Sequence, residues 1–244
     1  MIIKTIKGEV IDLGDKPIYS LSKPYSKGLY NVSNDEEQHI RITEGCPNRC
    51  VYCAESWENG TVPIYHEIPE INRNMVKLLD MNLIYKDKCI DILDDLGRRK
   101  INNKVIYYEL QCGIDWRNMT QEKASALKRN RFKNIRWAWD YAYSDAYKHF
   151  DCLKYLTNAG YNPKNIQVFM ICNWLVPYYE VMAKIKTLLK WNVQISDCWF
   201  DNQLPPDIKP IHWTEEEIKA FRHECRDHGI MIRHNGIQVE LIKK

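Results

Sequence analysis

The chain has 244 residues, of which 45% are hydrophobic and 27% charged, and its net charge is +3. This composition is that of a globular domain, and a dedicated nucleic-acid-binding domain would usually be more basic. No apolar run reaches the roughly 18–20 residues that cross a bilayer, so we expect no contact with a membrane.

The cysteine content and the N-terminus indicate a cellular location. The first residues, Met1–Thr5, lack the apolar core of a signal peptide. Nine cysteines in an intracellular chain of this length favour reduced thiols or metal ligands over a disulfide framework. We therefore expect a cytoplasmic protein.

Residues 1–38 form the first of three predicted regions. Turn formers such as Gly8, Gly14 and Pro17 separate short apolar runs in this stretch. The pattern predicts an N-terminal extension with one hairpin rather than an independent domain.

From residue 39 onward the sequence alternates between strand-like and helix-like patterns. The predicted strands are 39–43, 75–79, 105–110, 134–139, 166–171 and 193–199. The predicted helices are 86–99, 120–131, 144–159, 178–190 and 215–227. Thr120 and Thr214 stand where helix N-caps belong, Gly160 where a C-cap belongs, and Pro177 in a first helical turn. Such alternation predicts βαβ units with a parallel sheet, and six strands are fewer than the eight of a complete barrel.

Three cysteines lie close together after the first predicted strand. Cys46, Cys50 and Cys53 are spaced C-x3-C-x2-C. Thiolates are the usual ligands of iron–sulfur clusters, and three of them leave one iron of a four-iron cube open. The alternative is structural zinc, which takes four ligands. No second C-x2-C pair completes such a site, although His39 or His66 could serve as a fourth ligand.

This cysteine loop, with Tyr52 before its last cysteine, resembles the signature of the radical S-adenosylmethionine (radical SAM) superfamily. The resemblance implies a partial (β/α)6 TIM-like barrel over residues 39–200, with residues 201–244 closing its mouth or edge. It implies a [4Fe–4S] cluster on Cys46, Cys50 and Cys53 whose open iron is chelated by S-adenosylmethionine. A reductant such as flavodoxin or ferredoxin would supply the electron that generates a 5′-deoxyadenosyl radical. Tyr52 matches the family residue beside the adenine.

The expected contacts to the amino-acid end of SAM depart from the family pattern. After the second strand the superfamily has a Gly-Gly-Glu-like segment, but this chain has Asp80-Met81-Asn82-Leu83. Asp80 could pair with the SAM ammonium and Asn82 could accept a hydrogen bond from it. The alternative for both residues is a cap before the helix predicted from residue 86.

The third and fourth strands supply further candidates. Gly113, Asp115 and Arg117 match a Q-G-x-D-x-R pattern in a branch of small radical SAM proteins, with one additional residue before the glycine. Arg117 is the natural bidentate partner of the methionine carboxylate, and Asp115 could orient its guanidinium or touch substrate. A surface ion pair is the alternative. Asp140, at the end of the fourth strand, could bind ribose hydroxyls or substrate.

The candidates nearer the C-terminus each have a structural role as the alternative. Trp199 could wall the adenine or pack in the core, and Cys198 could donate a hydrogen atom or simply pack. His234 could act as an acid or base, or belong to an Asn-Gly turn of a terminal hairpin. The basic run 128–133 is explained by the end of a helix unless neighbouring residues extend it.

The sequence thus predicts a single-cluster radical SAM enzyme that abstracts hydrogen from a substrate. That substrate could be a nucleic acid or nucleoside, a peptide or a small metabolite. The alternative from another class is a zinc-stabilised binding module that uses the same cysteines and performs no reaction.

Overall fold

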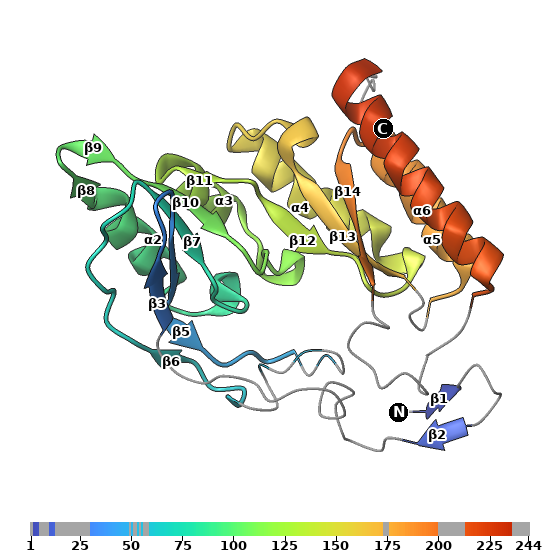
Figure 1. The fold of residues 1–244 in the computed structure, drawn as a ribbon, viewed down its shortest axis with the longest axis horizontal. Coiled ribbons are helices and arrows are strands. Elements are labelled where there is room, and N and C mark those ends of the chain that lie inside the picture. Colours follow the sequence, from blue (N-terminus) through green and yellow to red (C-terminus); the bar gives the residue numbers. More distant parts are fainter. Residues whose placement is uncertain are drawn as a thin grey trace.

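A parallel sheet forms the centre of the computed structural model, which describes residues 2–4, 10–12, 30–48, 50, 53, 55, 59–172, 176–199 and 213–235. Six strands run parallel and follow one another across the sheet in chain order (Figure 1). They are β4 (Gln38–Arg41), β7 (Met75–Leu78), β10 (Tyr107–Leu110), β12 (Arg136–Ala138), β13 (Gln167–Cys172) and β14 (Gln194–Trp199). Each strand coincides with one of the six stretches predicted from the alternation of apolar and polar segments, and its ends differ from the predicted ends by at most two residues.

The sheet is made of two ladders joined at one bridge. The first has the order β11-β10-β7-β4-β3, and the second has the order β12-β13-β14. An isolated parallel bridge between Ile114 and Trp137 connects them. Gly113 lies beside this bridge with φ +82, and a Cβ there would stand 2.9 Å from the Arg136 carbonyl oxygen. The absence of a side chain at Gly113 therefore lets the two ladders approach.

In the described part of the chain, five α-helices pack against the sheet. They are α2 (Cys89–Arg98), α3 (Gln121–Arg129), α4 (Ala146–Asn158), α5 (Tyr178–Lys190) and α6 (Glu215–Ile230). The predicted caps are confirmed: the Thr120 side chain accepts from Lys123 N–H, and Thr214 forms a full capping box with Glu217. Gly160 follows α4 with φ +95, whereas Pro177 is the N-cap of α5 and not part of its first turn.

Apolar side chains on alternate strand positions face these helices. Tyr108 donates its hydroxyl hydrogen to the Leu96 carbonyl of α2 at 2.7 Å, and Trp137 donates from Nε1 to His149 Nδ1 of α4 at 3.0 Å. Burial lowers the pKa of His149 to about 3, so this imidazole is neutral and carries its proton on Nε2. Trp137 and Tyr108 are fully buried and belong to one continuous core.

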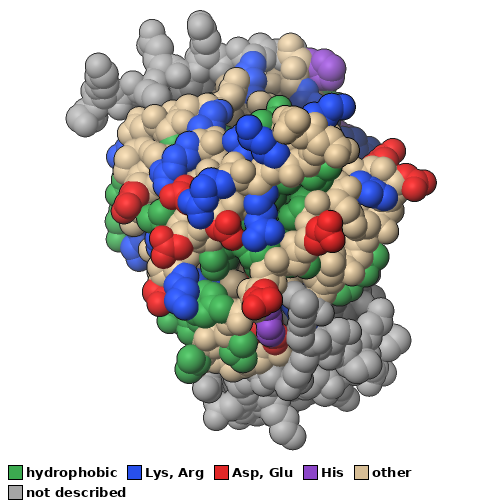
Figure 2. Space-filling view, turned by 90° about the vertical axis from the view of Figure 1, so that its left-hand side faces the viewer, with side chains coloured by type: hydrophobic (Ala, Val, Ile, Leu, Met, Phe, Trp, Pro, Cys, Tyr) green, Lys and Arg blue, Asp and Glu red, His purple; other side chains and the backbone are tan. Residues whose placement is uncertain are grey.

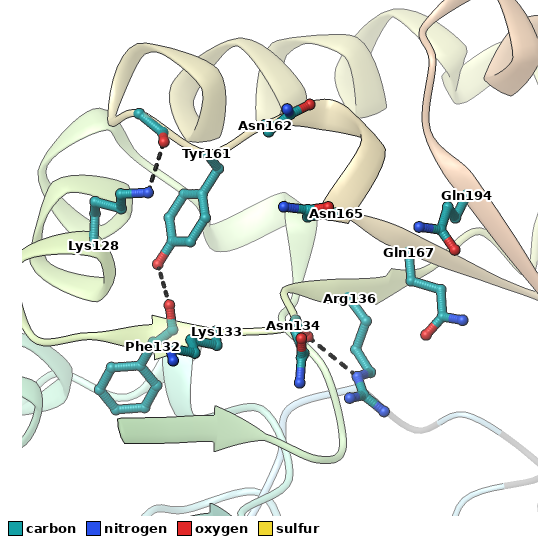
Figure 3. A pocket seen from close by; sticks show the side chains of 11 residues that line it. Lys128, Phe132, Lys133, Asn134, Arg136, Tyr161, Asn162, Asn165, Gln167 and Gln194 are labelled. Atoms are coloured by element: carbon teal, nitrogen blue, oxygen red, sulfur yellow. Dashed lines mark hydrogen bonds between the residues drawn. The ribbon is translucent and has the colours of Figure 1, made fainter. Parts of the chain in front are cut away.

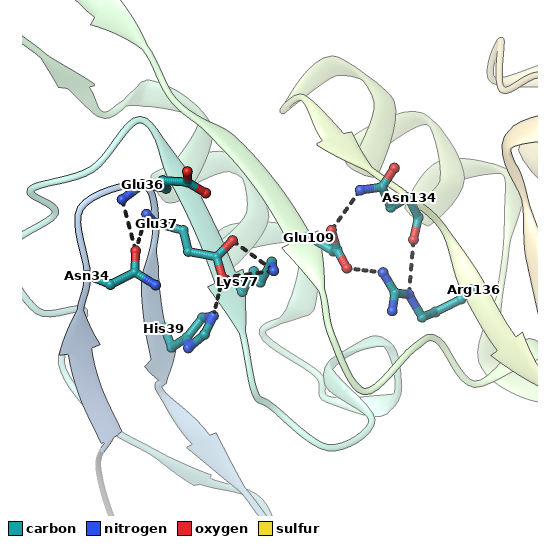
Figure 4. A network of polar contacts seen from close by, with 8 residues as sticks. All are labelled: Asn34, Glu36, Glu37, His39, Lys77, Glu109, Asn134 and Arg136. Atoms are coloured by element: carbon teal, nitrogen blue, oxygen red, sulfur yellow. Dashed lines mark hydrogen bonds and ion pairs between the residues drawn. The ribbon is translucent and has the colours of Figure 1, made fainter. Parts of the chain in front are cut away.

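The opposite positions give the sheet a polar second face. His39, Lys77 and Glu109 are register neighbours on β4, β7 and β10 (Figure 4). Lys77 pairs with Glu37 at 2.7 Å, and Glu109 pairs with Arg136. Period-two alternation therefore separates a helix-covered apolar face from a face lined by paired charges.

Several short elements were not predicted from the sequence. The hairpin of β8 (Lys100–Ile101) and β9 (Lys104–Val105) precedes β10 and turns through Asn102 and Asn103, both at positive φ. Where one strand was predicted over 134–139, Asn134 at φ 50 separates β11 (Phe132–Lys133) from β12. Asparagine adopts the left-handed conformation more readily than most residues, so these breaks occur at asparagines.

The remaining elements are peripheral. β1 (Ile2–Lys4) pairs antiparallel with β2 (Val10–Asp12), as the predicted N-terminal hairpin requires. β3 (Tyr30–Ser33) adds an antiparallel edge to β4, and β5 (Thr43–Glu44) pairs with β6 (Ile64–Tyr65). Short 3-10 turns are η2 (Leu83–Tyr85), η3 (Trp116–Asn118), η4 (Tyr143–Asp145) and η5 (Pro163–Asn165). The predicted terminal hairpin at Asn235 is wrong, because Met231–Asn235 continue α6 as a π-helical turn, η7.

The charged surface residues are mixed in sign. Figure 2 shows Lys and Arg interspersed with Asp and Glu over the face that includes α2 and the β8–β9 hairpin. Ion pairs on this face include Arg99 with Asp95 and Arg129 with Asp94. Within the described residues, no helix is long and apolar enough to cross a membrane.

The join between the two ladders can be tested at Gly113. We expect Gly113→Ala to destabilise the fold through both its positive φ and the overlap with the Arg136 carbonyl. Gly60→Ala is the matched control, because Gly60 has φ +77 but nothing within 4 Å of an added Cβ. Urea unfolding should show a loss of about 1–2 kcal/mol for the control and at least about 1 kcal/mol more for Gly113→Ala. Equal losses would contradict the close approach.

Candidate functional site

The cysteine loop begins where β4 and β5 end, at the carboxyl edge of the sheet. Gly45 precedes the first cysteine and is held from both sides. Its N–H donates to Glu55 Oε1 at 2.8 Å, and its carbonyl accepts from Lys86 Nζ at 2.8 Å. Gly45 has φ +84, and a Cβ would lie 2.3 Å from the Val62 carbonyl oxygen. Only glycine fits this position.

Buried charges hold both ends of the loop. Glu55 is fully buried, follows Cys53 and also accepts from Asn59 Nδ2 at 3.0 Å. Lys86 is 1% exposed and donates a second hydrogen bond to the Met81 carbonyl at 2.8 Å. Because Gly45 contacts both side chains, the backbone before Cys46 is fixed by one anion and one cation.

The three cysteines differ in exposure. Cys46 is buried, and Cys50 and Cys53 are partly exposed. Burial, with smaller contributions from the neighbouring Cys50 and Cys46 sulfurs, raises the pKa of Cys53 to about 12. The Cys53 thiolate therefore requires a cationic group beside it to form here. Among the described residues, no group of three or more His, Cys, Asp or Glu side chains is arranged to hold a single metal ion.

Asp115 connects the cysteine loop with two other strand-end loops. Its Oδ2 accepts from Asn48 Nδ2 at 2.8 Å, from Asn82 Nδ2 at 2.9 Å and from Asn118 Nδ2 at 2.9 Å. Asn48 lies between Cys46 and Cys50, and Asn82 follows β7. The loops after β4, β7 and β10 thus meet at one carboxylate, which is 6% exposed.

The second oxygen of Asp115 holds Arg117. Its Oδ1 accepts from Arg117 Nε at 2.7 Å and from the Arg117 backbone N–H at 3.2 Å. Burial alone would raise the pKa of Asp115, but the Arg117 guanidinium and the amide donors outweigh it and lower this pKa. The Arg117 side chain is 41% exposed and lies 5.5 Å above the Trp116 ring. Two hydrogen bonds to Asp115 Oδ1 therefore fix the position of Arg117.

Asp80 and Asn82 have different surroundings. Asp80 is fully buried, and its Oδ1 accepts from the Ile42 N–H, the Thr43 N–H and the Thr43 hydroxyl. Burial raises the pKa of Asp80 to about 6. Neither Asp80 nor Asn82 makes a side-chain capping bond to η2. Asn82 Nδ2 also lies 3.4 Å from Cys46 Sγ, while its Oδ1 is buried without a hydrogen-bond partner among the described residues.

Asp140 lies further along the same edge, after β12. It is 8% exposed and follows Trp139, whose carbonyl accepts from Lys184 Nζ at 3.0 Å. Burial lowers the pKa of Lys184 to about 8, against the attraction of Asp140. Aromatic rings pack next to Arg117. The Trp116 ring centroid lies 4.2 Å from that of His149, and the Trp139 ring centroid lies 4.4 Å from it.

The remaining predicted site residues are Tyr52, Cys198, Trp199 and His234. Tyr52 lies outside the described residues, and the side chains of Cys198 and Trp199 also lie outside them, although both residues belong to β14. His234 is exposed in the π-helical turn after α6. The roles proposed for these residues remain predictions.

Sequence reasoning missed four residues of this site. Asn48, Glu55 and Lys86 contact the loop through hydrogen bonds, and Gly45 permits its sharp turn. Gly45 had a signal, because a glycine directly before a ligand loop often marks a positive φ. Glu55 and Lys86 had none, since a buried charge is recognised only from its partners.

Comparison with known proteins supports the fold. No family model matches the chain, and no curated protein matches its sequence. Among solved structures, the chain is similar to the radical S-adenosylmethionine methyltransferase TsrM from Kitasatospora setae, solved with cobalamin and a [4Fe–4S] cluster bound. The TM-score is 0.56 at 12% identity, over 66% of this chain and 36% of that chain.

At this identity the likeness concerns the fold alone. The chain has an α/β fold with parallel strands that is shared with a radical SAM enzyme. It spans little more than a third of TsrM, so methyl transfer and cobalamin binding are properties of TsrM.

The Asp115 junction predicts a pH-dependent stability. A carboxylate with a lowered folded pKa stabilises the fold above its unfolded pKa, about 3.9, and this contribution is lost as pH falls through the folded value. We expect Asp115→Asn to lower the free energy of unfolding by about 3 kcal/mol at pH 7. The substitution replaces one acceptor oxygen with an NH2 group, which then faces the hydrogen-bond donors of the neighbouring residues. The difference from the unchanged protein in urea unfolding should shrink below about pH 4.

Asp151→Asn is the control for this measurement. Asp151 makes only an exposed pair with Lys154, and its loss should cost less than about 1 kcal/mol at every pH. A cost for Asp115→Asn that stays constant from pH 7 to pH 3 would contradict the role of its charge.

Proposed function

We propose that this protein is a single-cluster radical SAM enzyme built on a partial (β/α)6 barrel, with a [4Fe–4S] cluster on Cys46, Cys50 and Cys53. One observation carries the proposal: Asp115 joins the C-x3-C-x2-C loop to the loops after β7 and β10. Chemistry in parallel α/β folds takes place at the carboxyl ends of the strands. The similarity to TsrM in fold supports the same assignment.

The donor set suits an iron–sulfur cluster. Three thiols on a partly buried loop are soft ligands that iron–sulfur clusters take. Lys86 beside Gly45 adds positive charge next to thiolates and cluster sulfides. Asn82 Nδ2, 3.4 Å from Cys46 Sγ, is a hydrogen-bond donor of the kind that tunes cluster potential.

The amino-acid end of SAM would lie between Asn82 and Arg117. Asp115 holds Arg117 Nε, and no hydrogen bond within the described residues involves the terminal nitrogens, which leaves an edge for a bidentate bond to the methionine carboxylate. The buried Asn82 Oδ1 lacks a partner among the described residues and would accept from the SAM ammonium. Asn82 would thus replace the Gly-Gly-Glu-like segment, and Asp80 would support it by fixing the turn between β4 and β5. Tyr52, Asp140 and Trp199 are proposed for the adenine and ribose.

When bound, the cluster and SAM would supply a 5′-deoxyadenosyl radical that takes hydrogen from the substrate. The residues of this chain would position SAM, exclude water and orient the substrate. The polar face of the sheet, with Lys77, Glu109 and Arg136, suits a polar substrate (Figure 4). A flavodoxin or ferredoxin in the reducing cytoplasm would provide the electron.

The alternative is a binding module in which the same cysteines hold zinc. A zinc site needs four ligands. His66 is hydrogen-bonded to Glu44 through Nε2 at 2.7 Å, so its Nδ1 would have to supply the fourth ligand. Metal analysis separates the two functions.

Anaerobic purification should give a brown protein with about four irons and four sulfides per chain. With dithionite and SAM it should release 5′-deoxyadenosine, measured by liquid chromatography. Cys50→Ala should abolish release and lower the iron content, because a cluster with two protein ligands is not retained. Cys225→Ala, at a buried cysteine of α6, should retain both. A colourless protein with one zinc, or full release by Cys50→Ala, would refute the enzyme assignment.

Arg117→Lys tests the carboxylate contact separately. We expect the iron content to stay unchanged and the Kd for SAM to rise at least about tenfold, because lysine cannot form the bidentate pair. Equilibrium dialysis of the cluster-loaded protein measures this. Arg129→Lys, at the exposed pair with Asp94, should leave the Kd unchanged. If Arg117→Lys binds SAM normally, another group holds the carboxylate.

A further inference from the structure

A second concave site lies at the opposite edge of the sheet from the cysteine loop. Arg136, Gln167 and Gln194 are the first residues of β12, β13 and β14, and they are neighbours in register. They line a pocket of about 510 Å³, together with residues from the end of α3 and from the α4–β13 connection (Figure 3). This volume lies within the range of small-molecule pockets, roughly 300–1,000 Å³.

The walls of this pocket carry positive charge without negative charge. Three lining residues are cations, Lys128, Lys133 and Arg136, and no Asp or Glu lines it. Arg136 is paired with Glu109 behind the wall. Within the described part of the chain, neither lysine lies within 4 Å of a carboxylate. Lys128 Nζ donates to the Gly160 carbonyl at 2.6 Å, and Lys133 Nζ lies 3.3 Å from the Tyr107 ring centroid.

The remaining polar lining consists of amides. Gln194 is held by a hydrogen bond to the Lys164 carbonyl, and Asn134 is held by one to Glu109. The Asn165 and Gln167 side chains make no hydrogen bond with other described residues, and Figure 3 shows both at the pocket. Each can donate and accept. Figure 3 shows Lys128 and Lys133 toward one end of the pocket and Arg136 beside Gln167 toward the other. The end with the two lysines therefore suits an anion, and the end with the amides suits hydroxyl groups.

Only some residues of the basic run 128–133 line this pocket. Arg129 turns to Asp94, and Arg131 turns to the Ile106 and Gly97 carbonyls. Of the cations in this run, only Lys128 and Lys133 line the pocket, and Arg136 is the third cation in its lining. A nucleic-acid surface would present a continuous basic stripe, whereas this charge is confined to one cavity.

The aromatic wall argues against recognition of a nucleobase. Tyr161 donates its hydroxyl hydrogen to the Phe132 carbonyl at 2.9 Å, and Lys128 Nζ lies 4.7 Å from its ring centroid. This ring is fixed and one of its faces is already covered, so it offers a poor stacking platform.

We propose that this pocket binds a small organic phosphate, with the phosphate at Lys128 and Lys133 and a hydroxylated body at Asn165 and Gln167. The proposal is independent of the cluster chemistry, because the pocket lies at the amino ends of β12, β13 and β14, whereas the cysteine loop follows β4 at the carboxyl ends of the strands.

Isothermal titration of the full chain tests the proposal with three probes: glucose 6-phosphate, inorganic phosphate and a ten-nucleotide single-stranded DNA. Glucose 6-phosphate should bind with a stoichiometry of one and at least about tenfold tighter than inorganic phosphate, because the amides contact its hydroxyls. Lys133→Gln removes one charge and Asn165→Asp places a carboxylate of equal size at the pocket. Each should weaken binding at least about tenfold.

Lys104→Gln, at an exposed lysine of the β8–β9 hairpin, is the matched control and should bind like the unchanged protein. Thermal unfolding of each variant shows that it is folded, and both substituted pocket residues lie at the protein surface. Three outcomes would overturn the proposal: no binding of the sugar phosphate, equal affinity for inorganic phosphate, or unchanged affinity in both variants. Tighter binding of the DNA that is lost in the same variants would assign the pocket to nucleic acid instead.

Discussion

The buried carboxylate of Asp115 is the constraint on which the site depends. Three amide donors and one guanidinium converge on its two oxygens, and they come from the loops after three different parallel strands. A buried anion is tolerated only when its acceptor positions are filled. Any displacement of one loop would leave the carboxylate under-satisfied, so the loops hold one another in place without a shared backbone ladder.

The backbone at Gly45 is also held by buried charged groups. Glu55 accepts from its N–H and Lys86 donates to its carbonyl, so opposite charges hold the two polar groups of one peptide segment. Both charges are buried, and their cost is offset because each is hydrogen-bonded within the loop. The direction in which Cys46 leaves the sheet is thereby set before any metal binds. A preorganised loop of this kind reduces the entropy that cluster binding must overcome.

The local sequence pattern was sufficient to predict the helices and strands, but not the contacts between residues distant in sequence. Alternation located the six parallel strands, and threonine caps located two helix starts, because those signals are carried by neighbouring residues. The break at Asn134 and the turn at Asn102 escaped prediction, since a left-handed asparagine resembles an ordinary polar residue in sequence. In the site, the cysteine spacing and the Asp115–Arg117 pair were recognisable as motifs. The contribution of Asn48 depends on a contact across 67 positions, which no window of sequence reveals.

The two edges of the sheet carry different kinds of side chain, and there is a physical reason for this difference. At the carboxyl edge, the loops after the strands carry three thiols and the Asp115–Arg117 pair. At the amino edge, the first residues of β12, β13 and β14 are Arg136, Gln167 and Gln194, which remain partly exposed around an open cavity. The proposed cluster would have to be shielded from water, whereas the proposed site for a soluble anion would have to admit and release it. The parallel arrangement separates these demands, because every strand begins at one edge and ends at the other.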